Sequence, residues 1–170
     1  LRSADASPAG PFNQWPMGQG FERFYGFLAA DTDNFTPTLI ADTRPIATPA
    51  RADYHLSADL ADQAIAMIAA RHGQDPARPF MMYWATGAAH APHHAPEAWR
   101  QRYRGAFDAG WDAARETILM QQVKQGLVPK GTKLSPRPDF IPAWDSLSAD
   151  QQRLYARQME AFAAALSHAD

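Results

Sequence analysis

The fold class of this chain is decided by one stretch, Pro79-Phe-Met-Met-Tyr-Trp-Ala-Thr-Gly-Ala-Ala-His-Ala-Pro-His-His-Ala-Pro96. Its first part, residues 80–85, is an unbroken apolar run that is rich in aromatic side chains and too short for a helix. Such a run predicts a strand buried on both faces, which is the kind of strand found in parallel sheets covered by helices. The stretch therefore predicts an α/β fold.

A loop with several histidines follows the predicted strand. Gly87 permits the chain to turn away from the sheet, and Pro92 forbids a helix across the loop. In open α/β sheets, ligands bind just beyond the carboxyl ends of the strands. The histidine loop, which carries His90, His93 and His94, is therefore the candidate functional site of the chain.

Position distinguishes the histidines of this loop. His90 comes first after the small residues that end the strand, so we expect the sheet to hold its ring. His93 and His94 follow Pro92, so we expect them to turn outward, with a bond to a backbone carbonyl as their ordinary role. A metal site is the third interpretation, but catalytic zinc needs a further ligand and Pro92 rules out helical ligand spacing, so no metal site is predicted. Capping or surface roles are assigned to the other histidines, His55, His72 and His168.

Helices are predicted on both sides of the stretch. Apolar residues recur at helical spacing from Leu60 through Ala70, with Ser57 as the N-cap and Gly73 as the stop. The order of helix, strand and histidine loop fits a doubly wound sheet. Further helices are predicted at residues 96–103 and 110–125 and after Ser148, which forms a capping box with Gln151.

Proline and glycine make the remaining segments irregular. Residues 1–20 form a lead-in, and residues 126–146 form a long connection of the kind that lies on a surface or carries a binding loop. Residues 28–50 hold at most a short strand at Thr38–Ala41.

Two sets of residues in or beside these segments invite a functional interpretation. The carboxylates of Asp31, Asp33 and Asp42 suggest a metal, but aspartate in turns more commonly accepts hydrogen bonds from its own backbone. The tryptophans are expected to anchor the core and the loops, and Trp99 or Trp111 is a candidate for lining a pocket near the histidine loop.

Composition limits the functional class. With 170 residues, 46% of them hydrophobic, and a formal net charge of -2, the chain suits one soluble domain, or part of one, and gives no reason to expect nucleic acid. Cysteine is absent, which excludes disulfides, thiolate metal sites and cysteine nucleophiles among these residues.

No apolar window approaches the roughly 18 residues of a membrane span. An initiator methionine is also absent and the last helix has no stop signal, so we expect both ends to be internal to a longer protein.

An ordered set of segments carries a resemblance to a known family. It consists of Gly20–Phe27, Tyr54–Leu56, Pro79–Tyr83, His90–His93, Pro142–Ser148 and Leu154–Glu160. Together these segments resemble type I arylsulfatases, in the bacterial arylsulfatase branch of the alkaline phosphatase superfamily. Any one match would be weak, but their order and spacing across nearly the whole chain make the resemblance specific.

The resemblance implies an alkaline-phosphatase-like doubly wound sheet with flanking helices, of which residues 1–170 are an internal segment of one sulfatase catalytic domain. It implies hydrolysis of sulfate esters by a formylglycine made from Cys or Ser in a Cys/Ser-x-Pro-x-Arg motif, with Ca²⁺ bound nearby. That motif and the family's calcium ligands are missing here, so the implied Ca²⁺ ligands lie outside this chain and the isolated chain is expected to be inactive. The implied partners are a small-molecule sulfate ester and the remainder of the catalytic domain, in the bacterial cytoplasm or periplasm.

Within the family's pattern, His90 occupies the position of the histidine that contacts the sulfate ester near its leaving oxygen, and His93 is a second candidate contact. Cleavage leaves an alkoxide or phenoxide, to which an imidazolium can donate a hydrogen bond or a proton near neutral pH. Two other functions stay open: a phosphodiesterase or phosphonate hydrolase of the same superfamily, and a non-catalytic binding domain on the same fold.

Overall fold

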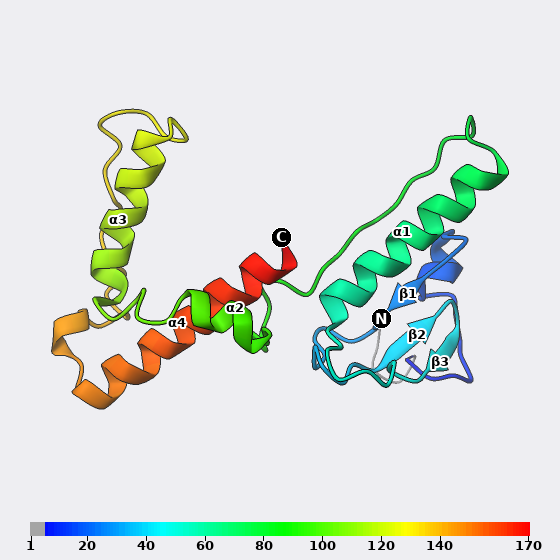
Figure 1. Cartoon of the computed structure of the whole chain (residues 1–170), viewed down its shortest axis with the longest axis horizontal. Coiled ribbons are helices and arrows are strands. Elements are labelled where there is room, and N and C mark those ends of the chain that lie inside the picture. Colours follow the sequence, from blue (N-terminus) through cyan, green and yellow to red (C-terminus); the bar gives the residue numbers. More distant parts are fainter. Residues whose placement is uncertain (1–5) are drawn as a thin grey trace. The chain divides into compact units, whose positions relative to one another are not determined.

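The computed structural model describes residues 6–170 (Figure 1), so residues 1–5 of the predicted lead-in lie outside the described part. The chain forms two compact units. The first unit holds the residues up to Pro96 together with residues 165–170, and the second unit holds Glu97–Ala164. The expectation that residues 1–170 belong to one catalytic domain stays a prediction.

The first unit contains a small antiparallel sheet in the order β1-β2-β3, with strands Tyr25–Gly26, Leu39–Ala41 and Arg44–Ile46. Leu39 of β2 lies opposite Ile46 of β3. β2 confirms the short strand predicted at Thr38–Ala41. The sequence pattern does not reveal β1 and β3, because both are too short to show alternation and β3 contains Pro45, a residue that argues against a strand.

Residues 80–85 do not form the buried parallel strand that the apolar run predicts. The segment is extended and runs back beside α1 (Leu56–Gln74; Figure 1), but no strand within residues 6–170 pairs with it. Its large side chains are exposed, to 54% for Phe80, 77% for Met81, 76% for Tyr83 and 47% for Trp84. A strand is stabilised by ladder hydrogen bonds to a neighbour, and the strands of the described residues pair only with one another. The predicted doubly wound parallel sheet is therefore not formed within the described residues, which carry the small antiparallel sheet instead.

The ends of α1 differ from the predicted ones. Its N-cap is His55 instead of Ser57, whose N–H donates to His55 Nδ1 at 3.2 Å. Histidine is not among the usual N-cap residues, which is why the pattern favours the nearby serine. At the other end, the helix passes Gly73 and stops at Gln74. Gly73 does not take the left-handed φ that makes glycine a helix stop.

The core of the first unit joins the sheet to the start of α1 through buried Leu39, Tyr54 and Leu56. Beside them the carboxylate of Asp59 is also buried, and it accepts hydrogen bonds from the hydroxyls of Tyr25 at 2.6 Å and Tyr54 at 2.9 Å. Burial, followed by the hydrogen bond to Asp59, raises the pKa of both tyrosine hydroxyls. Both hydroxyls stay protonated donors at neutral pH, and the bond from Tyr25 ties β1 to α1.

The second unit is helical, and its helices confirm those predicted. They are α2 (Glu97–Arg102), α3 (Gly110–Lys124) and α4 (Ala149–Ala169), of which α4 continues into residues 165–170. The predicted capping box is present: the Ser148 N–H donates to Gln151 Oε1 at 3.0 Å, and the Gln151 N–H donates to Ser148 Oγ at 3.3 Å. None of the helices in residues 6–170 has the length and apolarity that crossing a membrane demands.

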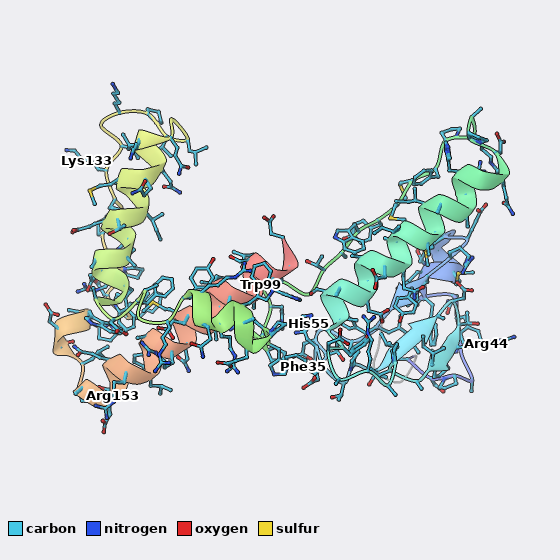
Figure 2. The ribbon with its side chains drawn as sticks, in the orientation of Figure 1. Phe35, Arg44, His55, Trp99, Lys133 and Arg153 are labelled. Carbon is cyan, nitrogen blue, oxygen red and sulfur yellow. The ribbon has the colours of Figure 1, made fainter. Side chains whose placement is uncertain are left out.

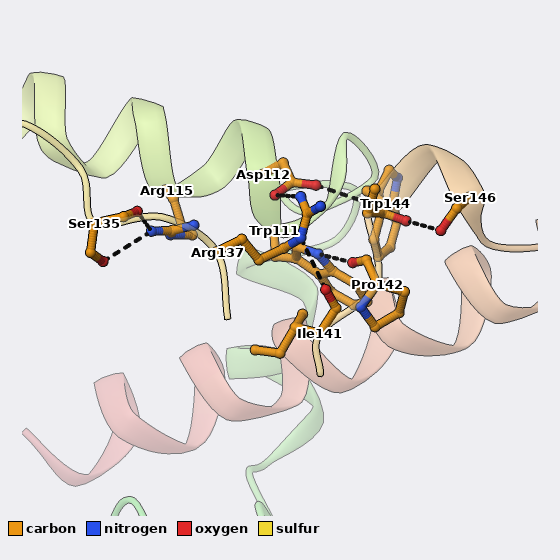
Figure 3. A network of polar contacts seen from close by, with 10 residues as sticks. Trp111, Asp112, Arg115, Ser135, Arg137, Ile141, Pro142, Trp144 and Ser146 are labelled. Atoms are coloured by element: carbon orange, nitrogen blue, oxygen red, sulfur yellow. Dashed lines mark hydrogen bonds and ion pairs between the residues drawn. The ribbon is translucent and has the colours of Figure 1, made fainter. Parts of the chain in front are cut away.

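Residues 126–143 are irregular, as predicted, but Trp144–Ser146 form a short 3-10 helix, η3, inside the predicted connection. Polar contacts hold this segment against α3 (Figure 3). Asp112 accepts hydrogen bonds from Arg137 Nη1 at 2.9 Å and from the Trp144 N–H at 3.0 Å. The Trp144 N–H, followed by the Arg137 guanidinium, lowers the pKa of Asp112. The indole N–H of Trp111 donates to the Pro142 carbonyl at 3.2 Å. The expectation that tryptophans anchor this region is met by Trp111 and by buried Trp144.

Gly110 is the position in this unit where a side chain would do the most damage. We expect Gly110→Ala to destabilise the second unit by about 2–5 kcal/mol, because its φ is +78° and an added Cβ would lie 2.0 Å from the indole of Trp144. Gly126→Ala is the matched control, since Gly126 has a φ of +74° but nothing within 4 Å of the added Cβ. Urea unfolding of both variants measures the difference, and equal losses would contradict the steric argument.

Candidate functional site

His90 lies in the histidine loop with its ring exposed. The His90 N–H donates to the Gly87 carbonyl at 2.9 Å, and ring atom Nδ1 lies 2.6 Å from the carbonyl oxygen of Ala91. Because a carbonyl oxygen can only accept, Nδ1 must carry a proton in this contact. The other ring nitrogen, Nε2, then accepts a hydrogen bond when the ring is neutral and donates one when the ring is cationic. Contrary to the expectation, no sheet among residues 6–170 holds the ring of His90, because residues 80–85 pair with no strand there.

His93 is turned back onto its own loop. Its Nε2 lies 3.3 Å from the carbonyl oxygen of Ala89, so this nitrogen is the donor. The contact is the backbone carbonyl bond that the sequence assigns to this histidine as its ordinary role, whereas the outward turn expected after Pro92 is not seen. A substrate contact for His93 stays a prediction.

His94 is the histidine of the loop with the most contacts to other segments. Its Nδ1 lies 3.5 Å from Asp33 Oδ2, and the Asn34 N–H points at the same Nδ1 from 3.4 Å. Its ring stacks on Phe35, with 5.4 Å between ring centroids and 23° between planes. The expectation that His94 turns outward after Pro92 is therefore wrong, because residues 33–35 hold the ring on one side.

Asp33 shapes the segment that contacts His94. Its Oδ1 accepts hydrogen bonds from the N–H groups of Phe35 at 2.7 Å and Thr36 at 2.8 Å, which confirms the predicted turn role for this aspartate. Burial alone would raise the pKa of Asp33, but the N–H groups of Thr36 and Phe35, together with His94, outweigh it and lower the pKa. The carboxylate is therefore charged at neutral pH.

His55 connects the histidine loop to α1. Because the Ser57 N–H donates to His55 Nδ1, the proton of the neutral ring sits on Nε2, which donates to the His94 carbonyl at 3.3 Å. The ring of Phe35 meets His55 edge-on at 5.3 Å (Figure 2), and the His168 ring lies 4.2 Å away. The capping role predicted for His55 is confirmed, but the side chain is buried, with 3% of its surface exposed.

The protonation of His55 predicts how the stability of the first unit depends on pH. Burial, followed by the charge of His168, lowers the pKa of His55, and burial lowers the pKa of His168. Below about pH 6.5, the unfolded chain therefore binds more protons at these histidines than the folded chain does. The free energy of unfolding is consequently highest above that pH and falls as the pH drops below it.

Thermal unfolding between about pH 7.5 and pH 5 measures this dependence. In His55→Asn, asparagine can still cap α1, so we expect a shallower loss of stability with falling pH. Exposed His72, mutated to Asn, should keep the wild-type slope. A wild-type slope in His55→Asn would contradict the assignment.

Two hollows border His90. A cleft of about 1010 Å³ lies between α1, the segment around β1 and residues 78–88, and its lining includes Leu60, Met67, Phe80, Met82 and His90. A second hollow of about 20 Å³, room for about one water molecule, lies between the histidine loop and the segment before β2. Its polar lining residues are Asp31, Thr32, Asn34 and His90.

Metal binding is not supported by these side chains. Residues 6–170 contain no group of three or more His, Asp or Glu side chains that could hold a metal ion. The described residues therefore do not fit the Ca²⁺ that the family resemblance implies.

In the first unit, α1 packs on the small sheet and the histidine loop borders an apolar cleft, as in part of an α/β domain. Residues 4–170 match the family described as Sulfatase. The chain therefore belongs to the sulfatase family, which implies an alkaline-phosphatase-like α/β fold.

Similar proteins carry the same family name. The chain is 23% identical over 167 residues to an arylsulfatase of Klebsiella aerogenes, a match that covers 91% of this chain and 35% of that protein. It is 23% identical over 168 residues to an uncharacterized sulfatase of Schizosaccharomyces pombe, covering 89% of this chain and 30% of that protein. The chain thus spans about a third of the length of the relatives it matches.

Proposed function

We propose that the chain is a segment of a sulfuric ester hydrolase and that it contributes His90 to the binding of a small sulfate ester near its leaving oxygen. One observation carries this proposal: the Nδ1 of His90 is bound to the Ala91 carbonyl, so Nε2 is the ring nitrogen left to contact a substrate. The residue is exposed and borders the cleft.

Hydrolysis of a sulfate ester breaks the bond between sulfur and the ester oxygen, and the oxygen leaves with a negative charge. An imidazolium of His90 would donate its Nε2 proton to that oxygen, while the Nδ1–H bond to Ala91 keeps the ring oriented. The family's formylglycine supplies the nucleophile, and no residue of this chain can become it, because cysteine is absent and no serine lies in a Ser-x-Pro-x-Arg motif.

The proposal includes a partner, the remainder of the same catalytic domain. Residues 80–85 are extended, carry exposed apolar side chains and form one wall of the cleft. Strands that pair with this segment would complete a parallel sheet, and helices packed on the two faces of that sheet would bury those side chains. The relatives are about three times as long as the chain, which leaves ample polypeptide to supply such strands.

The activity of the isolated chain provides a first test. We expect the 170-residue chain to show no turnover of an aryl sulfate and to bind Ca²⁺ no more tightly than about millimolar, because it lacks the nucleophile and the carboxylates of residues 6–170 form no metal-binding cluster. A colorimetric assay measures the turnover, and calorimetric titration measures the binding of Ca²⁺. Turnover that His90→Ala abolishes, or micromolar calcium binding, would contradict the proposal.

The decisive experiment uses the longer polypeptide that the proposal requires. Its gene should encode Cys/Ser-x-Pro-x-Arg before residue 1, and the purified protein should hydrolyse an aryl sulfate faster than a phosphate diester or a phosphonate ester. A preference for either phosphorus ester would assign it to the related phosphodiesterases or phosphonate hydrolases. Binding without turnover would indicate a non-catalytic domain.

A further inference from the structure

We propose that His94 is a positioning residue for His90. The segment Asp33–Phe35 and His55, at the start of α1, contact Pro92 and His94 at the end of the histidine loop, and we call these contacts the clamp. The clamp orients the ring of His90. The inference rests on the proposed function of His90, and it gives a role to contacts between parts of the chain that are distant in sequence.

The side chain of His94 has a partner in either protonation state. In the neutral ring, Nδ1 can accept a hydrogen bond from the Asn34 N–H, whose donor lies 3.4 Å away. In the cation, Nδ1 carries a proton and faces the Asp33 carboxylate, 3.5 Å away. Because Nδ1 cannot accept a hydrogen bond and carry a proton at the same time, the contact with Asn34 belongs to the neutral ring and the contact with Asp33 to the cation. The stacked ring of Phe35 supports the imidazole in both.

The backbone on both sides of His93 is held as well. The Pro92 carbonyl accepts from Asn34 Nδ2 at 3.4 Å, and the His94 carbonyl accepts from His55 Nε2 at 3.3 Å. The clamp is anchored on α1, because the carbonyl of Asn34 accepts from the Leu56 N–H at 2.8 Å, and Leu56 is fully buried. A loop held by a helix terminus is placed more accurately than a loop held by itself.

The clamp reaches His90 through one peptide group. The ring of His90 donates to the carbonyl of Ala91, which belongs to the peptide joining Ala91 to Pro92. The next carbonyl, that of Pro92, is the one that Asn34 holds. If Pro92 moves, the Ala91 carbonyl moves with it and the ring of His90 loses its orientation. Displacement of a reacting group by about 1 Å can cost up to 10²-fold in rate.

The kinetic test is a double-mutant cycle in the longer polypeptide. We expect His94→Ala to lower kcat by about 10- to 100-fold with little change in KM. In a His90→Ala background the same mutation should cost less than about twofold, because it acts through the ring that is already gone. His94→Asn, whose amide oxygen can accept from the Asn34 N–H in place of Nδ1, should recover part of the rate. The matched control, His72→Ala, changes an exposed histidine outside the clamp and should leave kcat unchanged.

A second measurement does not depend on activity. Hydrogen–deuterium exchange of residues 87–96 should become faster in Asn34→Ala, since the amides of His90 and His94 donate within this loop, whereas exchange in α1 should stay at its wild-type rate. Additive losses in the double-mutant cycle, or unchanged exchange in Asn34→Ala, would overturn the clamp. If the wild type hydrolyses no sulfate ester, the proposed function fails, and exchange alone then decides whether the clamp exists.

Discussion

Replacing His90 by alanine in the longer sulfatase polypeptide is expected to lower turnover of an aryl sulfate by about 10²- to 10⁴-fold, the usual range for one positioned acid or electrostatic donor. The structure gives the physical reason. The Nδ1 of His90 is bound to the Ala91 carbonyl, so the exposed ring offers Nε2 as its reactive nitrogen. No other ring of the loop combines that exposure with a bond that sets its orientation.

The leaving group provides the sharpest readout for His90. A donor to the leaving oxygen matters most when that oxygen is a poor leaving group, so the loss in His90→Ala should be greater for a weakly acidic phenol than for a strongly acidic one. Turnover of two such aryl sulfates measures this difference. A loss that is the same for both substrates would remove the assigned role.

His93→Ala and His94→Ala serve as comparisons within the same loop. His93 bonds the Ala89 carbonyl, so its removal should have a much smaller effect than removal of His90. His94 contacts Asp33 and Asn34, so its removal should have an intermediate effect that disappears when His90 is already absent. Equal losses at all three positions would mean that the loop acts only as a structural unit.

The isolated chain is expected to self-associate instead of behaving as a compact monomer. Residues 80–85 expose large apolar side chains and unpaired backbone groups beside a cleft of about 1010 Å³. An extended apolar segment without a strand partner is a site for pairing with another chain. Size-exclusion chromatography should show oligomers or aggregates, and a hydrophobic dye should bind strongly.

Charged substitutions on this segment provide the control for self-association. Met81 and Tyr83 are 77% and 76% exposed, so a double change of both residues to lysine should leave the first unit folded while reducing association and dye binding. The control changes two exposed residues of the second unit to lysine, Ile118→Lys with Met120→Lys. This control should reduce self-association and dye binding less. A monomeric wild-type chain with cooperative melting and no dye signal would contradict both this expectation and the proposal that strands of the same domain cover the segment.

The candidate site shows where reasoning from the sequence is limited. His90 is found from its place after an apolar run and from its position in the family's pattern. Asp33, Asn34 and Phe35 are missed as parts of the site, because a turn-forming Asp-Asn pair is common and nothing in the sequence spacing joins Asn34 to His94, 60 residues away. Two signals were available, the predicted turn at Asp33 and the family resemblance of the histidine loop, but only folding brings them together.

The sequence by itself determined the local features: the positions of α2, α3 and α4, the capping box of Ser148 and Gln151, and membership of a known family. The helices and the capping box depend on contacts between residues a few positions apart, which a single sequence displays, and the family shows in the order of short motifs along the chain. Only the tertiary structure decided that residues 80–85 have no strand partner among residues 6–170, that His55 caps α1, and that His94 is held by residues 33–35. Strand pairing and a clamp between loops depend on hydrogen bonds and ring contacts between segments far apart in the chain, and no local pattern specifies which distant segment will supply the partner.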